Sequence, residues 1–203
     1  FNNSGQSCNA PTRMLVERPV YDAAVATAER VANEMIVDVA SKNGRHIGPV
    51  VSQAQFDKIQ GLIESGQSEG ARLVAGGVGR PDGLEVGYFV RPTVFADVSP
   101  EMTISRTEIF GPVLAITPFD TDDEAIEMAN DTSFGLTNYV QTGDIDRARQ
   151  VAKRLRSGMV EMNGKSRSAG SPFGGYRQSG NGREGGTWGL EEFLEVKAVS
   201  GWA

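Results

Sequence analysis

The chain has 203 residues, of which 39% are apolar and 23% charged, and its formal net charge is −6. This composition is typical of a soluble globular protein with room for one large domain or two small ones. No apolar run approaches the roughly 20 residues of a membrane-spanning helix, and the acidic balance without Lys/Arg runs argues against a nucleic-acid partner. The single cysteine excludes an intrachain disulfide and favours a reducing compartment, here the cytoplasm.

The chain opens at Phe1 without an initiator methionine, a basic segment or the apolar segment of a signal peptide. We therefore expect it to be a portion of a longer polypeptide, with a processed N-terminus as the alternative. Hydrophobic periodicity then predicts the elements in order. Helices are expected over 19–37 and over 52–69, where Ser52 and Gln55 have the spacing of a capping box. Two more are expected after the N-caps Thr121 and Asp144, the first with three acidic residues in its first turn. Strands are expected over 12–17, 71–75, 89–95, 113–119, 136–141, 159–163 and 193–199.

Strands that alternate with helices predict an α/β fold with a largely parallel sheet and flanking helices. Residues 165–189 break this pattern, because they are rich in glycine and serine and lack periodicity. A loop of this length inside a compact domain is usually functional or disordered. The final strand at 193–199 follows it alone, and an isolated strand needs a partner sheet.

Cys8 stands among small and polar residues in the stretch NSGQSCNA, which is not the setting of a core cysteine. Two readings are open on these residues: an inert surface thiol or a covalent nucleophile. His46, the one histidine, has no local link to Cys8, so a Cys/His hydrolase is poorly supported. One cysteine and one histidine do not make a metal-ligand cluster, and no metal site is predicted.

Other segments carry weaker signals. Glu108 and Phe110 lie in TEIFGP, where a carboxylate and a ring beside a Gly-Pro turn could hold a ribose and a flat cofactor. The alternative is an exposed loop carboxylate and an ordinary buried ring. Phe173 lies in PFGG, and its glycines could serve phosphate binding or tight turning. No segment has the strand, glycine motif and helix of a complete dinucleotide-binding fingerprint.

Taken together, these segments resemble the aldehyde dehydrogenase superfamily, in its C-terminal catalytic portion. The resemblance rests on the cysteine signature around Cys8, the EIFGPV motif and Asn130 with Phe134-Gly135-Leu136. It also rests on PFGG at 172–175 and on the motifs that follow it, and it spans nearly the whole chain. It implies a catalytic domain over 1–185, with the N-terminal cofactor domain absent, and a tail with an oligomerisation strand over 186–203.

The resemblance also implies roles. Cys8 would attack an aldehyde carbon, and its backbone N–H would form half of an oxyanion hole. Glu108, Phe110 and Gln55 would bind NAD or NADP, and Phe173 would line the substrate entrance. The enzyme would oxidise an aldehyde to a carboxylic acid through a cysteine thiohemiacetal and thioester, as a homo-oligomer, either dimer or tetramer. The fragment alone is expected to be inactive.

Two alternatives to this reading remain open: a CoA-acylating semialdehyde dehydrogenase and a catalytically silent structural fragment. A further choice concerns the loop before Phe173, which carries Lys165 and Arg167 where the family often has aromatic or apolar residues. These cations would select an anionic aldehyde, or they are simply solvated at the mouth of the substrate tunnel.

Overall fold

The structure is a computed structural model that describes residues 1–202. The chain divides into two compact units, unit 1 over Phe1–Ala129 and unit 2 over Asn130–Ala203. The two units are separated because residues within each unit contact one another more than they contact the other unit. The predicted boundary at 185, which separates a catalytic part from a tail, stays a prediction.

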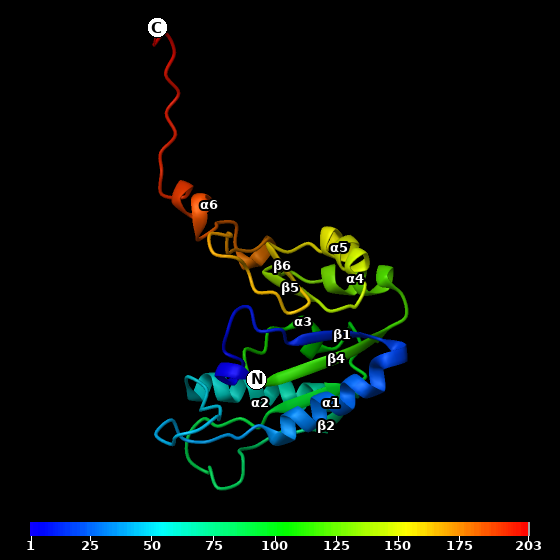
Figure 1. Cartoon of the computed structure of the whole chain (residues 1–203). Coiled ribbons are helices and arrows are strands. Elements are labelled where there is room, and N and C mark those ends of the chain that lie inside the picture. The colour runs from blue at the N-terminus through cyan, green and yellow to red at the C-terminus, as the bar shows by residue number, and fades with distance from the viewer. Residues whose placement is uncertain (203) are drawn as a thin grey trace. The chain divides into compact units, whose positions relative to one another are not determined.

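Unit 1 is built on a four-stranded sheet with the order β1-β4-β3-β2 (Figure 1). Its strands are β1 (Arg13–Glu17), β2 (Arg72–Ala75), β3 (Thr93–Ala96) and β4 (Val113–Phe119). The pairs β1–β4 and β3–β4 are parallel, and only β2 runs antiparallel to its neighbour β3. The predicted α/β fold with a largely parallel sheet is therefore confirmed.

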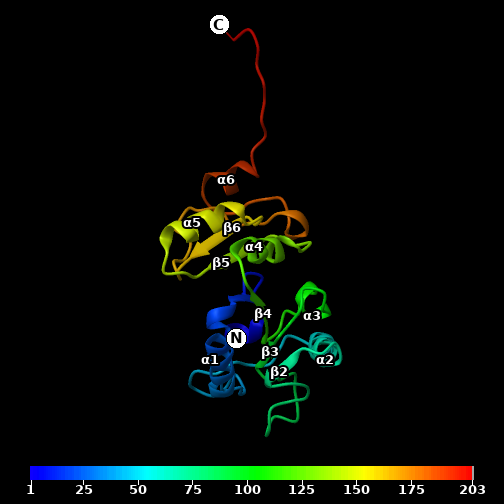
Figure 2. The same cartoon turned by 90° about the vertical axis from the view of Figure 1, so that its right-hand side faces the viewer.

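Helices cover both faces of this sheet, α1 (Tyr21–Glu34) on one and α2 (Gln53–Ser68) on the other (Figure 2). Successive residues of a strand point to opposite faces. Val94 and Ala96 of β3 accordingly pack in one apolar cluster with α1, while Phe95 packs in another with α2. All three side chains are 0% exposed. A strand buried on both faces needs this continuous apolar run, which explains why it lacks an alternating pattern.

Unit 2 contains the parallel pair β5 (Thr137–Val140) and β6 (Met159–Met162). The helix α5 (Ile145–Arg154) connects them. Its predicted N-cap, Asp144, accepts hydrogen bonds from the backbone N–H groups of Asp146 at 2.9 Å and Arg147 at 3.1 Å. These bonds satisfy amides that the first helical turn leaves without a partner.

The last residue of helix α4 (Asp122–Asn130) is the first residue of unit 2, and the first turn of α4 holds three acidic residues, as predicted. Elements of one or two turns show no period in a sequence, and several are not among the predicted elements. They are α3 (Thr103–Arg106), α6 (Gly186–Glu191) and the 3₁₀ turns Asn2–Gly5 and Arg177–Ser179. A further 3₁₀ turn, Arg18–Val20, occupies the start of the helix predicted over 19–37, so that α1 begins at Tyr21. Across residues 1–202, no helix is both long and apolar enough to cross a membrane.

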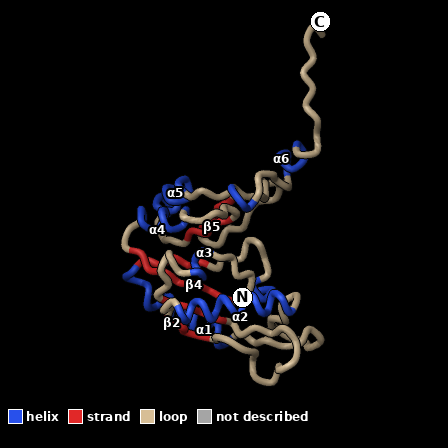
Figure 3. Tube along the Cα trace, turned by 180° about the vertical axis from the view of Figure 1, so that it is seen from behind, coloured by secondary structure: helices blue, strands red, loops and turns tan. Residues whose placement is uncertain are grey.

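The predicted strand at 193–199 is not formed, and this expectation is corrected. The segment is drawn as loop (Figure 3), with Phe193 88% and Val196 98% exposed. A strand exists only by pairing with a neighbour, and no strand pairs with this segment among residues 1–202. Its apolar side chains are therefore left in solvent.

One buried tyrosine ties α1 to the end of β3. The Tyr21 hydroxyl accepts the backbone N–H of Asp97 at 2.6 Å and donates to the Asp97 carboxylate at 3.0 Å. Arg72 contacts the same carboxylate at 2.7 Å and holds the pKa of Asp97 below its usual range. Burial raises the pKa of Tyr21. This network fixes Asp97 in a left-handed conformation, with φ of 56°.

Substituting Tyr21→Phe should therefore lower the free energy of unfolding by about 1–2 kcal/mol, because the Asp97 N–H loses its partner in a part-buried position. Urea denaturation measures the change. Tyr88→Phe is the matched control, since this ring is 36% exposed and its loss of a hydroxyl should change stability by less than about 0.5 kcal/mol. Equal effects of the two substitutions would contradict a structural role for the Tyr21 network.

Candidate active site

Cys8 lies in a tight turn between the first 3₁₀ turn and β1. The turn is closed by a hydrogen bond from Ala10 N to Ser7 O at 3.0 Å and by one from Ser7 Oγ to Asn9 Oδ1 at 2.7 Å. The Cys8 thiol is free and exposed, which agrees with the prediction that it is not a core cysteine. An exposed thiol can meet a substrate, as a nucleophile must.

The residues just before Cys8 adopt an unfavourable backbone. Asn3 and Ser4 have φ of 52° and 54°, a left-handed conformation that costs about 1–3 kcal/mol for residues other than glycine. Side chains hold it in place: Ser4 Oγ donates to Gly48 O at 2.7 Å, and Gln6 Oε1 accepts from Val51 N at 2.8 Å. No role is predicted for residues 48–51 from the sequence. The structure shows that this segment supports the turn that carries the cysteine.

The cysteine segment is packed directly on the EIFGPV segment. A Cβ atom added to Gly5, which has φ of 71°, would lie 2.0 Å from Gly111 O and 2.9 Å from Pro112 N. Nearby, Thr12 O accepts from Ala115 N at 2.9 Å where β1 meets β4. Two motifs about 100 residues apart are therefore in backbone contact, and a side chain at Gly5 would separate them.

Glu108 and Phe110 follow α3 on this second segment. Ile109 between them is 1% exposed and anchors the loop in the core. The Glu108 side chain is exposed and, within residues 1–202, makes no hydrogen bond or ion pair. Phe110 is partly buried and has φ of 54°. The loop thus presents an unpartnered carboxylate and a constrained ring beside the turn packed on Gly5.

Gln55 joins α2 to the same loop. Its spacing from Ser52 predicted a capping box, in which each residue bonds to the other's backbone. Half of it forms, because Ser52 Oγ accepts from Gln55 N at 3.2 Å. The Gln55 side chain instead donates through Nε2 to Ile109 O and to Phe110 O, at 2.9 Å each. The structure thus brings together Gln55 and Phe110, and with them the segment of Cys8.

Phe173 lies in unit 2, in the glycine-rich segment. Its backbone pairs with that of Glu184 through two hydrogen bonds of 2.8 Å. The Arg167 guanidinium carbon lies 5.0 Å from the centre of the Phe173 ring, within the range of a cation–π contact. The role of Phe173 at a substrate entrance stays a prediction.

Further motif residues of unit 2 serve its architecture. The Asn130 side chain donates to Arg154 O at 3.0 Å and accepts from Arg156 N at 2.7 Å, which joins the end of α4 to the end of α5. A Cβ atom added to Gly158 would lie 1.9 Å from Gly174 O. The glycine-rich segment is therefore anchored just before β6, where Gly158 and Gly174 approach closely.

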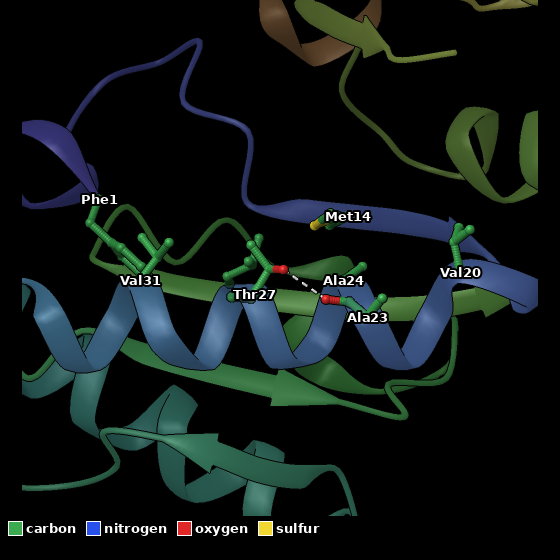
Figure 4. Close-up of a pocket in the computed structure, with 9 residues that line it drawn as sticks. Phe1, Met14, Val20, Ala23, Ala24, Thr27 and Val31 are labelled. Carbon is green, nitrogen blue, oxygen red and sulfur yellow. Dashed lines mark hydrogen bonds between the residues drawn. The ribbon is translucent and has the colours of Figure 1, made fainter. Parts of the chain in front are cut away.

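A surface groove of about 510 Å³ lies elsewhere in unit 1, beside α1 and β1 (Figure 4). Phe1, Met14, Val20 and Val31 are among its lining residues. The polar side chain in this lining belongs to Thr27, whose hydroxyl is already bonded to Ala23 O at 2.8 Å. The groove offers no group for acid–base or nucleophilic chemistry, so it is not the candidate site.

Comparison with known proteins gives a consistent result. The profile of the aldehyde dehydrogenase family matches residues 1–199. A 3-succinoylsemialdehyde-pyridine dehydrogenase of Pseudomonas sp. is 52% identical over 200 residues, which cover 98% of this chain and 42% of that protein. The solved structure of an aldehyde dehydrogenase from Bartonella henselae is 59% identical with a TM-score of 0.98, and the match covers 100% of this chain and 42% of that one.

Another solved structure is a cysteine-to-alanine variant of aldehyde dehydrogenase C from Pseudomonas syringae, in complex with NAD⁺ and octanal. It is 48% identical, with a TM-score of 0.97, and the match covers 100% of this chain and 42% of that one. The chain thus spans about two fifths of the length of these relatives.

Proposed function

The chain belongs to the aldehyde dehydrogenase family, and we propose that it is the C-terminal, cysteine-bearing catalytic portion of an NAD(P)-dependent aldehyde dehydrogenase. One observation carries the proposal. The close approach of Gly5 to Gly111 joins the turn of Cys8 to the loop of Glu108 and Phe110. A nucleophile and the residues proposed for the cofactor are thereby held on one rigid backbone arrangement.

In the proposed reaction the Cys8 thiolate attacks the aldehyde carbon and forms a thiohemiacetal, whose oxyanion accepts a hydrogen bond from the Cys8 backbone N–H. A nicotinamide cofactor, when bound, supplies the acceptor for the hydride that leaves this carbon. Loss of the hydride turns the thiohemiacetal into a thioester. Water then attacks the thioester carbon and breaks the C–S bond, which releases the carboxylic acid and regenerates Cys8.

The side chains around Phe110 suit the ribose and ring of such a cofactor. A ribose hydroxyl is a hydrogen-bond donor, and the unpartnered Glu108 carboxylate accepts such bonds strongly. The partly buried Phe110 ring offers an apolar face against the nicotinamide. We propose that Gln55, bonded to the same loop, completes this cofactor side.

We further propose that the rest of the polypeptide carries the dinucleotide-binding domain, the oxyanion-hole Asn and the general-base Glu. The apolar groove supports this proposal, because Met14, Val20 and Val31 are 37%, 56% and 38% exposed there, and exposed apolar patches mark contact surfaces. We propose that association into a dimer or tetramer would bury the exposed apolar side chains of the tail at 193–199. Because a free thiol persists in a reducing compartment, we propose that the protein lies in the cytoplasm.

The first test is the intact mass of the natural protein, followed by an assay of NADH or NADPH formation with a panel of aldehydes. A mass more than twice 21.7 kDa together with aldehyde-dependent turnover supports the proposal. The panel includes the semialdehyde named in the 52%-identical relative. Turnover that requires CoA would instead indicate an acylating enzyme, and no turnover from the full-length protein would favour a silent fragment.

Lys165 and Arg167 provide a prediction about substrate charge. Arg167 lies over the Phe173 ring, so its charge is held beside the residue proposed for the substrate entrance. The substitutions Lys165→Ala and Arg167→Ala should raise KM for a carboxylate-bearing semialdehyde by about three- to tenfold, because each removes a cation that attracts it. KM for a neutral aldehyde of similar length should change by less than about twofold. Equal changes for both substrates would mean that the cations are merely solvated.

A further inference from the structure

The amide of Gln55 is committed to the loop that carries Phe110. An amide nitrogen has two hydrogens, and both are used, one on Ile109 O and one on Phe110 O, at 2.9 Å each. Gln55 lies three residues after the helix cap Ser52, where its side chain would ordinarily turn back to the helix terminus. The Gln55 side chain donates to the loop carbonyls in place of the capping-box bond to Ser52.

These two bonds act on a backbone that needs support. Phe110 has φ of 54°, a conformation that persists only where the surroundings impose it. The carbonyls on both sides of its φ torsion, those of Ile109 and Phe110, are the two that Gln55 holds. The next residue, Gly111, is packed against Ile59 of the same helix, with 2.6 Å from an added Cβ to Ile59 Cδ1. The loop is thus fixed to α2 at three successive residues, Ile109, Phe110 and Gly111.

We propose that Gln55 is a positioning residue that acts through Phe110: its two donors hold the left-handed backbone and so set the direction of the ring. This inference rests on the proposed role of Phe110 beside the nicotinamide. It assigns to the Gln55 nitrogen a task within the protein and leaves no hydrogen on it for the cofactor. Only Oε1 would be available for a direct contact with a ribose hydroxyl.

A positioning role through the amide donors and a direct ribose contact through Oε1 predict opposite results for two variants of the full-length enzyme. Gln55→Glu keeps an acceptor oxygen and loses the donors, whereas Gln55→Lys keeps donors and loses the acceptor. A positioning role predicts that Gln55→Glu raises the Kd for NAD⁺ about tenfold, with KM for the aldehyde changed less than about twofold. Gln55→Lys should then recover at least half of the lost affinity on a logarithmic scale. Calorimetric titration of NAD⁺ measures the Kd without turnover.

Gln53→Glu is the matched control, because Gln53 lies two residues earlier and its side chain donates to the exposed Asp57, at 2.6 Å. It should leave the Kd for NAD⁺ within about twofold of the wild type. A second experiment compares Gln55→Met with and without Phe110→Ala. If Gln55 acts through the ring, Gln55→Met should weaken NAD⁺ binding less than about twofold in the Phe110→Ala background.

Independent, multiplicative losses in that pair of backgrounds would overturn the proposal, as would an unchanged Kd in Gln55→Glu. Thermal melting checks that each variant is folded, and the Lys variant keeps the test valid where the Met variant does not fold. Failure of this inference differs visibly from failure of the proposed function. In the second case the wild-type enzyme itself neither binds NAD⁺ nor oxidises aldehydes.

Discussion

Substituting Cys8→Ala in the full-length polypeptide should reduce aldehyde oxidation by about 10⁴-fold or more, because the covalent route has no other nucleophile. The exposed turn that holds Cys8 tolerates the change, so the melting temperature should stay within about 2 °C of the wild type. Steady-state NADH formation measures the loss of activity. Mass spectrometry of the trapped thioester intermediate should place the acyl group on Cys8 in the wild-type enzyme alone.

The matched control is Ser7→Ala, which removes the neighbouring exposed hydroxyl and its bond to Asn9 Oδ1. This change loosens the turn without touching the thiol, and activity should fall less than about tenfold. An active Cys8→Ala enzyme would refute the proposed chemistry. Inactivity of the wild-type full-length protein toward all aldehydes would return the chain to the alternative of a silent structural fragment.

The elements that the sequence predicted correctly share a local physical cause. The caps Ser52 and Asp144 are short polar side chains directly before an apolar period, and both accept the expected backbone N–H bonds. The strand of 113–119 was recognised because its apolar run is continuous, as a strand covered on both faces requires. In these cases the local pattern of residue types is enough to predict the element, although the strand itself forms by pairing with β1 and β3.

The errors share a cause as well, since each concerns contacts that residues distant in the chain make or fail to make. The Gln55 side chain leaves the predicted capping box for the carbonyls of Ile109 and Phe110, more than 50 residues away. The strand at 193–199 lacks any pairing partner among residues 1–202. The secondary-structure propensity of a residue contains no information about a competing hydrogen bond to a distant residue or about the absence of a neighbouring strand.

The candidate site illustrates the same limit. The residue types around Cys8, Glu108 and Phe110 pointed to the family, yet no pattern in the sequence showed that their segments touch. That contact depends on Gly5, whose absent side chain leaves room for Gly111. The sequence contains 25 glycines, and only the structure separates those that permit a close approach from those that merely turn the chain.

Gly5→Ala should therefore have the largest effect on the fold of any single methyl addition near the site. The new Cβ would lie 2.0 Å from Gly111 O and 2.3 Å from Gly111 C, and these backbone atoms precede β4 and cannot rotate away as a side chain would. Together with the positive φ, we expect a loss of about 3 kcal/mol or more in the free energy of unfolding, measured by urea denaturation. Aldehyde oxidation should fall with it.

Gly79→Ala is the control for Gly5→Ala, because it introduces backbone strain without a steric clash between two segments. Gly79 also has a positive φ, of 91°, but a Cβ there meets nothing within 4 Å. Its substitution should cost only about 1–2 kcal/mol, the ordinary penalty for alanine in a left-handed conformation, and should leave activity unchanged under conditions where the protein is folded. If Gly5→Ala behaved like Gly79→Ala in both respects, contact between the cysteine turn and the Phe110 loop would not be required for the site.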